Sequence, residues 1–376
     1  MATRAAAAVD GFTVHESLGA LAAACGEGEW DALAAASGNV FASRLWLETW
    51  WRHFGRDRPL RLGAHRAADG TLTAIVPLYL ASRRPVRMLR FLGHGASDQL
   101  GPICARGDER AGAEALALAV AATGRAWDAL LADELPTSLP WAPSTGRVLG
   151  RQASPVARLS GCTVESWLAA RSANLRSQLA RAERRLAAAG RVTHRTTAHA
   201  EDVARDLDTV IALHDRRWAA RGGSRSFVGR EAFHHDVCAQ AFARGWLRLH
   251  VLEVDGEPVA ALYNLRFEGA ESFYQGGRDP AFDRCSVGLV LHARAIGRAI
   301  EDGIDEYRFL RGDEAYKHRF ADEDRPLQSI GVARTAPGRA TLAAVGRLAM
   351  GPRWLVRSIP APYAWRTGAT PRWGAP

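Results

Sequence analysis

The stretch WLRLHVLEVDGEPVAALYNLRFEGAESFYQGG, residues 246–277, predicts the central sheet of the chain. Apolar and polar residues alternate with a period of two through three segments, as in strands that bury one face. Asp255-Gly256 and Glu268-Gly269 separate the segments, and such pairs favour tight turns. The stretch therefore predicts a three-stranded antiparallel meander.

Helical patterns lie on both sides of this meander. The segment SANLRSQLARAERRLAAAG, residues 172–190, has one apolar stripe at helical spacing: Leu175, Leu179, Ala182 and Leu186. A second helix is expected within 202–223. After the meander, SVGLVLHARAIGRAIEDG (286–303) predicts a third helix, and IDEYRFLRG (304–312) predicts a further strand. Two helices, a meander, a helix and a strand thus follow one another in order.

The preceding part of the chain, residues 1–155, has the pattern of a separate mixed α/β unit. VFASRLWLETWWRHFG (40–55) predicts a helix with an aromatic face and with Ser43 as its N-cap. LRLGAHRAADGTLTAIVPLYL (60–80) predicts two strands around a turn, and RMLRFLGHGASDQLGPI (87–103) predicts a strand followed by a Gly-rich loop. We therefore expect two α/β units, 1–155 and 156–335, each with a mostly antiparallel sheet flanked by helices, and a tail at 336–376.

The positive charge of the chain is localised. The formal net charge is +9, but the tail 336–376 contains six Arg and no acid, and residues 171–195 contain seven Arg and one Glu. The remainder is slightly acidic. This distribution does not favour a nucleic-acid-binding surface. The Arg-rich helix at 172–190 is either a solvated face or a site for phosphates of coenzyme A, a nucleotide sugar or tRNA.

Several kinds of site are excluded by missing motifs. The chain has no G-x-G-x-x-G after a strand, no G-x-x-x-x-G-K and no H-E-x-x-H, and GASDQ lacks the second Gly of a nucleophile elbow. The five cysteines are scattered and form no C-x-x-C pair, which favours reduced thiols and disfavours a zinc site. No apolar run is long enough for a membrane span, and the N-terminal residues do not resemble a signal peptide. We therefore expect a cytoplasmic protein that needs no metal.

Lys317 is the only lysine, although Lys and Arg together number 49. Arg is a planar fork that stays protonated, whereas Lys is a compact point charge with an adjustable pKa. A site that needs either property would retain Lys in an Arg-rich chain. Chance retention at the surface is the alternative.

The order of these elements resembles the acyltransferase half of the GCN5-related N-acetyltransferase (GNAT) superfamily. The segments that carry the resemblance are NLRSQLARAERRLAAAG, ALHDRRWAARGG, GEPVAALYNLRF, SFYQGGRDP, SVGLVLHARAIGRAIEDG and FLRGDEAYKHRF. More specifically, they are similar to the BioF2-like or cellulose-biosynthesis-protein acetyltransferases, relatives of the FemAB aminoacyltransferases. SRLWLETWWRHFG, PLYL and FLGHGASDQLGP resemble the first half of such tandem proteins.

The resemblance implies acyl transfer from an acyl thioester, with acyl-coenzyme A as co-substrate. The acceptor would be an amine or hydroxyl of a sugar, a polysaccharide precursor or another small metabolite. Two departures leave the donor open: Arg308 stands where an acidic residue is expected, and the pyrophosphate loop of simple GNAT enzymes is reduced to SVG. An aminoacyltransferase that uses aminoacyl-tRNA, and a non-catalytic partner of a membrane polysaccharide synthase, remain alternatives.

The resemblance also indicates which residues would form the site. The expected catalytic residues, for the oxyanion or a donor phosphate and for proton removal, are Lys317, Glu314, Asp313 and Asp98. The expected donor-binding residues are Ser286, Val287, Gly288, Tyr274, Gln275 and Arg311. Ser286 is also the expected cap of a helix whose N-terminus would attract anions. The expected substrate-binding residues are His214 and Arg217.

The tail combines its six Arg with three Trp, which suits the surface of an anionic membrane. It could equally fold back on the body of the protein. We therefore expect a cytoplasmic location, with peripheral contact with the inner membrane face as an option.

Overall fold

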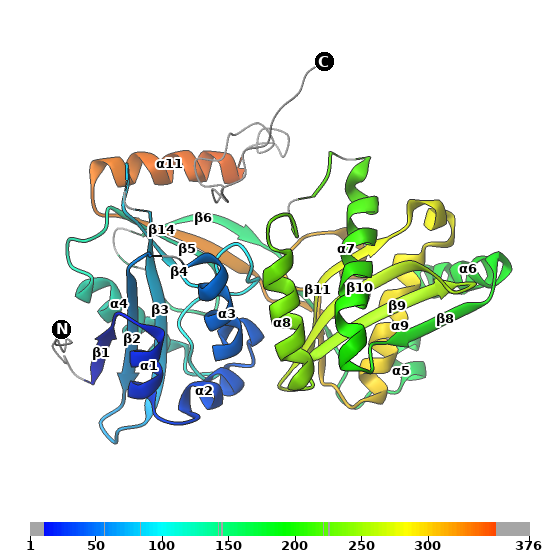
Figure 1. Ribbon diagram of the computed structural model, residues 1–376, viewed down its shortest axis with the longest axis horizontal. Coiled ribbons are helices and arrows are strands. Elements are labelled where there is room, and N and C mark those ends of the chain that lie inside the picture. Colours follow the sequence, from blue (N-terminus) through cyan, green and yellow to red (C-terminus); the bar gives the residue numbers. More distant parts are fainter. Residues whose placement is uncertain are drawn as a thin grey trace, which may run out of the picture.

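The computed structural model describes residues 11–350, except residues 56, 83, 142, 144, 145, 221 and 225, and side chains to residue 347. Two seven-stranded sheets lie side by side, each with helices on its faces (Figure 1). The predicted mixed α/β architecture of two sheet-based units is confirmed. Among the described residues, no helix combines the length and apolar character that crossing a membrane requires.

The first sheet is antiparallel except where β4 runs parallel to β5. In spatial order its strands are β1 (Phe12–His15), β2 (Leu60–Arg66), β3 (Leu72–Ser82), β4 (Met88–Phe91), β5 (Ala129–Pro136), β14 (Leu327–Ala333) and β6 (Gly146–Gln152). The turn that was expected at residues 69–70 joins β2 and β3.

The second sheet contains the predicted meander. In spatial order its strands are β13 (Glu323–Asp324), β7 (Pro155–Arg158), β12 (Glu306–Arg308), β11 (Ala270–Arg278), β10 (Glu257–Phe267), β9 (Leu247–Val254) and β8 (Val192–Thr196). β9, β10 and β11 are antiparallel, as the alternation predicts. Only β11 and β12 run parallel.

The helices cover the sheets from several sides (Figure 1). Those around the first sheet are α1 (Leu18–Cys25), α2 (Glu29–Ser37), the 3-10 turn η1 (Val40–Ala42), α3 (Arg44–Phe54), α4 (Glu109–Ala122) and α11 (Ala336–Met350). Those around the second are α5 (Val164–Ala169), α6 (Ala173–Ala189), η2 (Ala200–Asp202), α7 (Val203–Ala219), α8 (Glu231–Ala243), η3 (Pro280–Cys285), α9 (Val287–Glu301) and α10 (Ala315–Phe320). α7 packs on β10 and β11, while α9 packs on the same strands and on β9.

The C-terminal boundary of the second unit differs from the expectation. Sequence order assigns residues 327–335 to the second unit, but β14 pairs with β5 and β6 and lies inside the first sheet. α11, the first part of the expected tail, packs on β5, β6 and β14. A local pattern identifies a strand but not its partner, which explains the difference. The tail beyond residue 350 lies outside the described residues.

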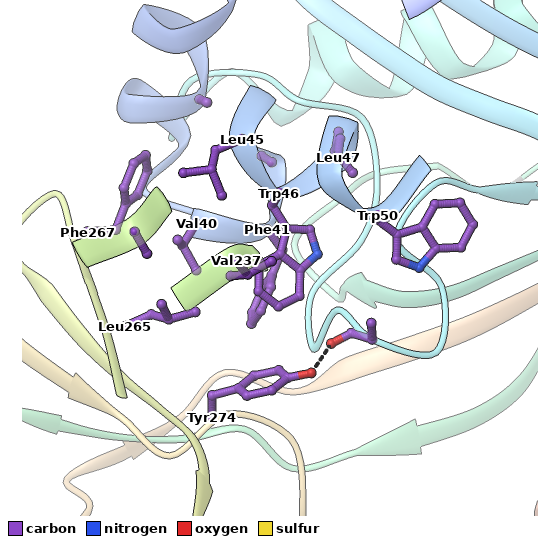
Figure 2. Packing of buried hydrophobic residues seen from close by; sticks show 14 of the residues in the cluster. Val40, Phe41, Leu45, Trp46, Leu47, Trp50, Val237, Leu265, Phe267 and Tyr274 are labelled. Atoms are coloured by element: carbon purple, nitrogen blue, oxygen red, sulfur yellow. Dashed lines mark hydrogen bonds between the residues drawn. The ribbon is translucent and has the colours of Figure 1, made fainter. Parts of the chain in front are cut away.

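One hydrophobic core joins the two units. α3 begins after Ser43, whose side chain accepts a hydrogen bond from the Trp46 backbone N–H, as predicted. The Trp46 ring meets Phe233 of α8 edge-on, with ring centroids 5.3 Å apart. It also meets Tyr274 of β11 edge-on, with centroids 5.6 Å apart (Figure 2). Buried aromatic contacts of this kind favour a fixed arrangement of the units.

A bulge and a splay open the second sheet next to this core. Between β10 and β11 the register passes from Gln275 to Phe273, so Tyr274 has no partner residue on β10. β11 pairs with β12 only as far as Ser272, opposite Arg308. Beyond these residues the two parallel strands separate. Bulges of this kind often lie beside functional sites, because they redirect side chains and end strand pairing.

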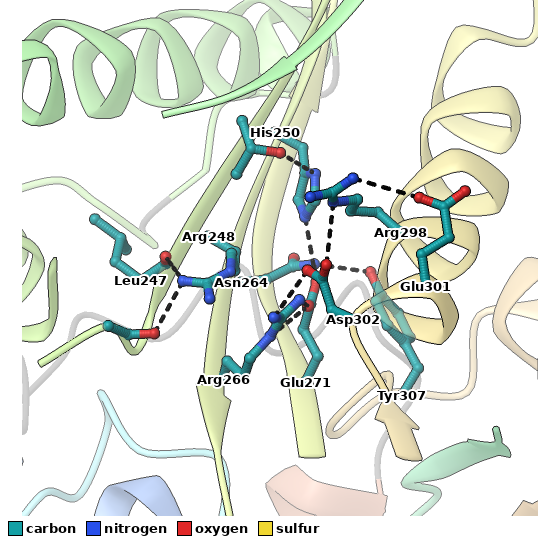
Figure 3. Close-up of polar contacts among 12 residues, drawn as sticks. Leu247, Arg248, His250, Asn264, Arg266, Glu271, Arg298, Glu301, Asp302 and Tyr307 are labelled. Carbon is teal, nitrogen blue, oxygen red and sulfur yellow. Dashed lines mark hydrogen bonds and ion pairs between the residues drawn. The ribbon is translucent and has the colours of Figure 1, made fainter. Parts of the chain in front are cut away.

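A buried polar network holds the strands together where they are still paired. The Glu271 carboxylate accepts hydrogen bonds from Asn264 at 2.7 Å and from Arg266 at 2.8 Å, and it contacts His250 at 3.2 Å (Figure 3). Asn264 also donates to the Tyr307 hydroxyl of β12 at 3.1 Å. Burial alone would raise the pKa of Glu271, but these partners hold it at about 2. Glu271 is therefore ionised and paired, as a buried charge must be.

Candidate active site

A cavity of about 190 Å³ lies where β11 and β12 separate. It brings together residues that are far apart in the sequence, because Asp98 comes from the Gly-rich loop of the first unit and the others come from the second. Eight of the predicted site residues line it: Asp98, His214, Arg217, Tyr274, Gln275, Arg311, Glu314 and Lys317.

Lys317 lies on α10 with only 4% of its surface exposed, so it is not a chance surface lysine. Its ammonium group donates to the Arg311 carbonyl at 2.7 Å and pairs with Glu314 at 3.0 Å. A lysine ammonium has three donors, so one remains for a molecule in the cavity. Gly312, at φ +125°, lies against this pair without a side chain.

Arg311 connects the two units through carboxylates. The Arg311 Nε atom lies 2.8 Å from Asp98 Oδ1, and its Nη1 atom lies 2.8 Å from Glu134 Oε1 on β5. Burial raises the pKa of Asp98, and the positive charges of Arg311 and Lys317 offset only part of this shift. Burial raises the pKa of Glu134 in the same way. Because Arg311 already pairs with both carboxylates, it is suited to position Asp98 and is less suited to bind a donor.

His214 and Arg217 reach the cavity from α7. His214 is buried, and its ring contacts the Gly276 carbonyl at 3.2 Å and the Ser224 hydroxyl at 2.8 Å. Burial lowers the pKa of His214, which favours the neutral ring. The Arg217 guanidinium lies 5.5 Å from the Trp218 ring centre. Its buried Nε has no hydrogen-bond partner, and no described carboxylate pairs with it. Arg217 is therefore the uncompensated cation of the cavity.

Tyr274 fixes the wall of the cavity to the first unit. Its hydroxyl donates to the Ala96 carbonyl at 2.8 Å, in the Gly-rich loop two residues before Asp98 (Figure 2). Gln275 follows it on β11. Sequence analysis missed the other lining residues: Trp218, Ser226, Phe273, Phe309 and Tyr316. Trp218, Phe273 and Tyr316 are adjacent in the sequence to Arg217, Tyr274 and Lys317, and this adjacency was the available signal. Ser226 and Phe309 adjoin no predicted site residue.

Four predicted residues do not line the cavity. The Asp313 side chain is exposed and pairs with His318 at 2.7 Å, because the turn before α10 directs it to solvent. Ser286 precedes α9 but makes no side-chain cap bond, since its left-handed backbone (φ 51°) directs the hydroxyl elsewhere. Val287 is fully buried in the core. Gly288 lies beside Arg278. The predicted cap is therefore wrong, while anion binding at this terminus stays a prediction.

The comparison with protein families identifies the class. Residues 173–318 match the model of the Acetyltransferase (GNAT) domain. This segment contains α6, the meander, α9, β12 and Lys317, and therefore most of the cavity. With the fold described above, the match defines an acyltransferase with a GNAT domain.

Solved structures share this fold over most of the chain. The structure of FemX superimposes with a TM-score of 0.58 and 10% identity, over 85% of this chain and 98% of that one. L-PGS from Bacillus licheniformis gives a TM-score of 0.53 and 13% identity, over 86% and 96%. The C-terminal domain of a putative lysylphosphatidylglycerol synthetase from Agrobacterium fabrum gives 0.52 and 14%, over 86% and 96%. No curated protein matches the sequence. At these identities the similarity is one of fold.

Proposed function

We propose that the cavity transfers an acyl group from an acyl thioester, with acyl-coenzyme A as the donor, to an amine or hydroxyl of a small acceptor. The acceptor classes are a sugar, a polysaccharide precursor or another small metabolite, as in the BioF2-like acetyltransferases that the sequence resembles. The observation that carries the proposal is the splay of β11 from β12, with Lys317 and Asp98 brought to it from two units.

The splay supplies a place for the donor. Beyond Ser272, β11 has no strand partner on its β12 side among the described residues. An unpaired strand edge presents backbone N–H and C=O groups to an extended ligand. The free donor of Lys317 is suited to stabilise the oxyanion that forms when an acceptor attacks a thioester carbonyl.

Asp98 is suited to remove the proton of the acceptor. A carboxylate accepts a proton more readily when burial raises its pKa, and Asp98 lines the cavity while Arg311 holds one of its oxygens. Glu314 pairs with Lys317 and orients the ammonium group. Arg217 is suited to bind an anionic group of the substrate, a carboxylate or phosphate, because its charge has no described ion-pair partner.

An aminoacyl donor is the second candidate. The fold that the chain shares with FemX and with a putative lysylphosphatidylglycerol synthetase domain favours it. Binding of tRNA would depend strongly on salt, which separates the two donors. A non-catalytic role is disfavoured by the paired and buried Lys317. A cytoplasmic location, with peripheral membrane contact through the tail 336–376, stays part of the proposal.

Calorimetric titration with acyl-coenzyme A esters, followed by assays of thiol release with amino sugars and amino acids, tests the proposal. We expect micromolar binding by the native protein. We also expect acceptor-dependent thiol release that falls about 10²–10³-fold in Lys317→Ala. His318→Ala is the matched control, because His318 lies on the same helix but outside the cavity. Absence of binding for every ester would reject acyl-coenzyme A as the donor.

A further inference from the structure

A second cavity, of about 780 Å³, lies on the other side of the second unit. α5, α6, β8 and α9 form its walls, and it shares no residue with the candidate active site. Of these elements, α6 and β8 lie at the end of the second sheet that is farthest from the first unit (Figure 1). The proposed acyl transfer therefore leaves this cavity without a role.

Buried apolar residues line one part of the second cavity, and polar residues line the rest. Trp167, Leu179 and Ala293 contribute to it from three different helices. Gly297 of α9 also lines it, and a Cβ atom there would meet only Val164, at 3.7 Å. The indole Nε1 of Trp167 is a buried donor without a partner among the described residues. These features leave room for an apolar group of moderate size.

The charged residues around this interior carry an excess of positive charge. Arg294 is neutralised by Glu183, which it binds at 2.7 and 3.1 Å. Arg298 lies 3.4 Å from Glu301. Arg176 has no described carboxylate partner, since it donates only to the backbone carbonyls of Ala169 and Arg171. Burial lowers the pKa of His194 to about 4, so this lining residue is neutral at pH 7. Arg176 is thus the charge that a ligand could neutralise.

A chain of contacts links the second cavity to the wall of the first. The His194 ring lies 3.2 Å from His250, which contacts Glu271 at 3.2 Å. The polar network of Figure 3 then continues through Asn264 to Tyr307, whose hydroxyl lies 3.4 Å from His292. His292 packs on Phe273 and Tyr316, which line the candidate active site. The second cavity is therefore built on the same framework as the first.

We infer that the second cavity binds an amphipathic anion, a carboxylate on an apolar chain, at a site separate from acyl transfer. The chain lies on Trp167, Leu179 and Gly297, and the carboxylate binds Arg176. Charge complementarity identifies the ligand class, because the one lining charge without a described ion-pair partner is positive. The inference does not depend on the proposed function.

Calorimetric titration of the full chain with decanoate, without any thioester, tests the inference. We expect saturable binding that weakens at least about tenfold in Arg176→Glu, since reversal of the anchoring charge turns attraction into repulsion. Arg181→Glu is the matched control, because Arg181 lies on the same helix, is exposed and does not line the cavity. Decyltrimethylammonium has a similar chain and the opposite charge, and we expect it not to bind the native protein.

A second variant separates this cavity from the active site. Gly297→Leu fills the apolar part of the cavity, so we expect it to abolish decanoate binding while binding of acetyl-coenzyme A is unchanged. Lys317→Ala is expected to leave decanoate binding unchanged. The inference is overturned if decanoate does not saturate the native protein. It is also overturned if Arg176→Glu and Arg181→Glu weaken binding equally, or if only Lys317→Ala weakens it.

Discussion

At the scale of single residues, the candidate site depends on the position of one ammonium group. Lys317 is held by the Arg311 carbonyl and by Glu314, and both lie within a few residues of it in the chain. An arginine fork would not fit this buried position, which has one carbonyl and one carboxylate. The presence of this one lysine in an Arg-rich sequence thus has a structural explanation. The pairing of Asp98 with Arg311 was not predictable, because no local pattern relates residues in two different units.

Gly312→Ala is expected to displace Lys317 without removing it. A Cβ atom at residue 312 would lie 2.3 Å from Glu314 Oε2 and 2.8 Å from Lys317 Nζ. We expect kcat to fall roughly 10²-fold, because a shift of about 1 Å in a catalytic group has effects of that size. The rate of thiol release at a saturating concentration of donor measures this fall in kcat.

Gly303→Ala is the control for backbone strain. Gly303 also has a positive φ, +71°, but no atom lies within 4 Å of the Cβ position. Both variants should lose about 1 kcal/mol of stability, and only Gly312→Ala should lose activity. Equal activities in the two variants would show that the Lys317–Glu314 pair has no catalytic importance.

At the scale of elements, amphipathic patterns predicted α3, α6 and the meander correctly. Each of these buries one face whose period is visible in the sequence, such as the stripe of Leu175, Leu179, Ala182 and Leu186. The strands β5, β6, β7 and β14 were not predicted. β5 is buried on both faces and β6 is mostly exposed, so neither shows the alternation of a half-buried strand. The splay of β11 also depends on the partner strand, which the sequence does not identify.

The Glu271 network should make the second sheet sensitive to acid. The pKa of Glu271 is about 2 in the folded chain and 4.5 in the unfolded reference. Because the folded-state pKa is lower, the stabilisation is complete above about pH 4.5 and is lost as the pH falls toward 2. Glu271→Gln should cost roughly 3 kcal/mol at pH 7, since Arg266 loses one of its two carboxylate partners and keeps only Asp302. The substitution should also reduce the dependence of the unfolding free energy on pH between about pH 4.5 and 2.

Denaturant unfolding between pH 2.5 and 7 measures both effects. Glu257→Gln is the control, because Glu257 is exposed on β10 and the change in charge is the same. A Glu271→Gln protein with the native slope of stability against pH would mean that other carboxylates cause the acid sensitivity.

At the scale of the whole molecule, the path of the chain links the two sheets. The chain passes from the first sheet to the second between β6 and β7, and it returns between β13 and β14. β14 then lies between β5 and β6. The candidate active-site cavity lies at the junction that this path creates, where Tyr274 lines the cavity and packs against Trp46 of the first unit. The first sheet is therefore incomplete until the chain has passed through the second sheet, whose own strands are consecutive in the sequence.

Truncations at two positions should have very different effects. A chain that ends at Met350 keeps β14 and α11, so we expect its thermal unfolding to match that of the full chain. A chain that ends at Arg325 lacks the strand between β5 and β6, and we expect loss of cooperative unfolding in the first unit. Calorimetry compares the two. A normal transition in the shorter chain would show that β14 is dispensable.

The position of β14 also sets an order of events on the ribosome. Domains generally fold as units while the chain emerges, with the N-terminal one first. Here β5 and β6 emerge early, but the strand that belongs between them emerges only after the entire second sheet. Until residue 333 has left the exit tunnel, the edges of β5 and β6 are open to strands of other chains. The nascent first unit is therefore a natural client for chaperones, and its last strand completes the first sheet in a single late step.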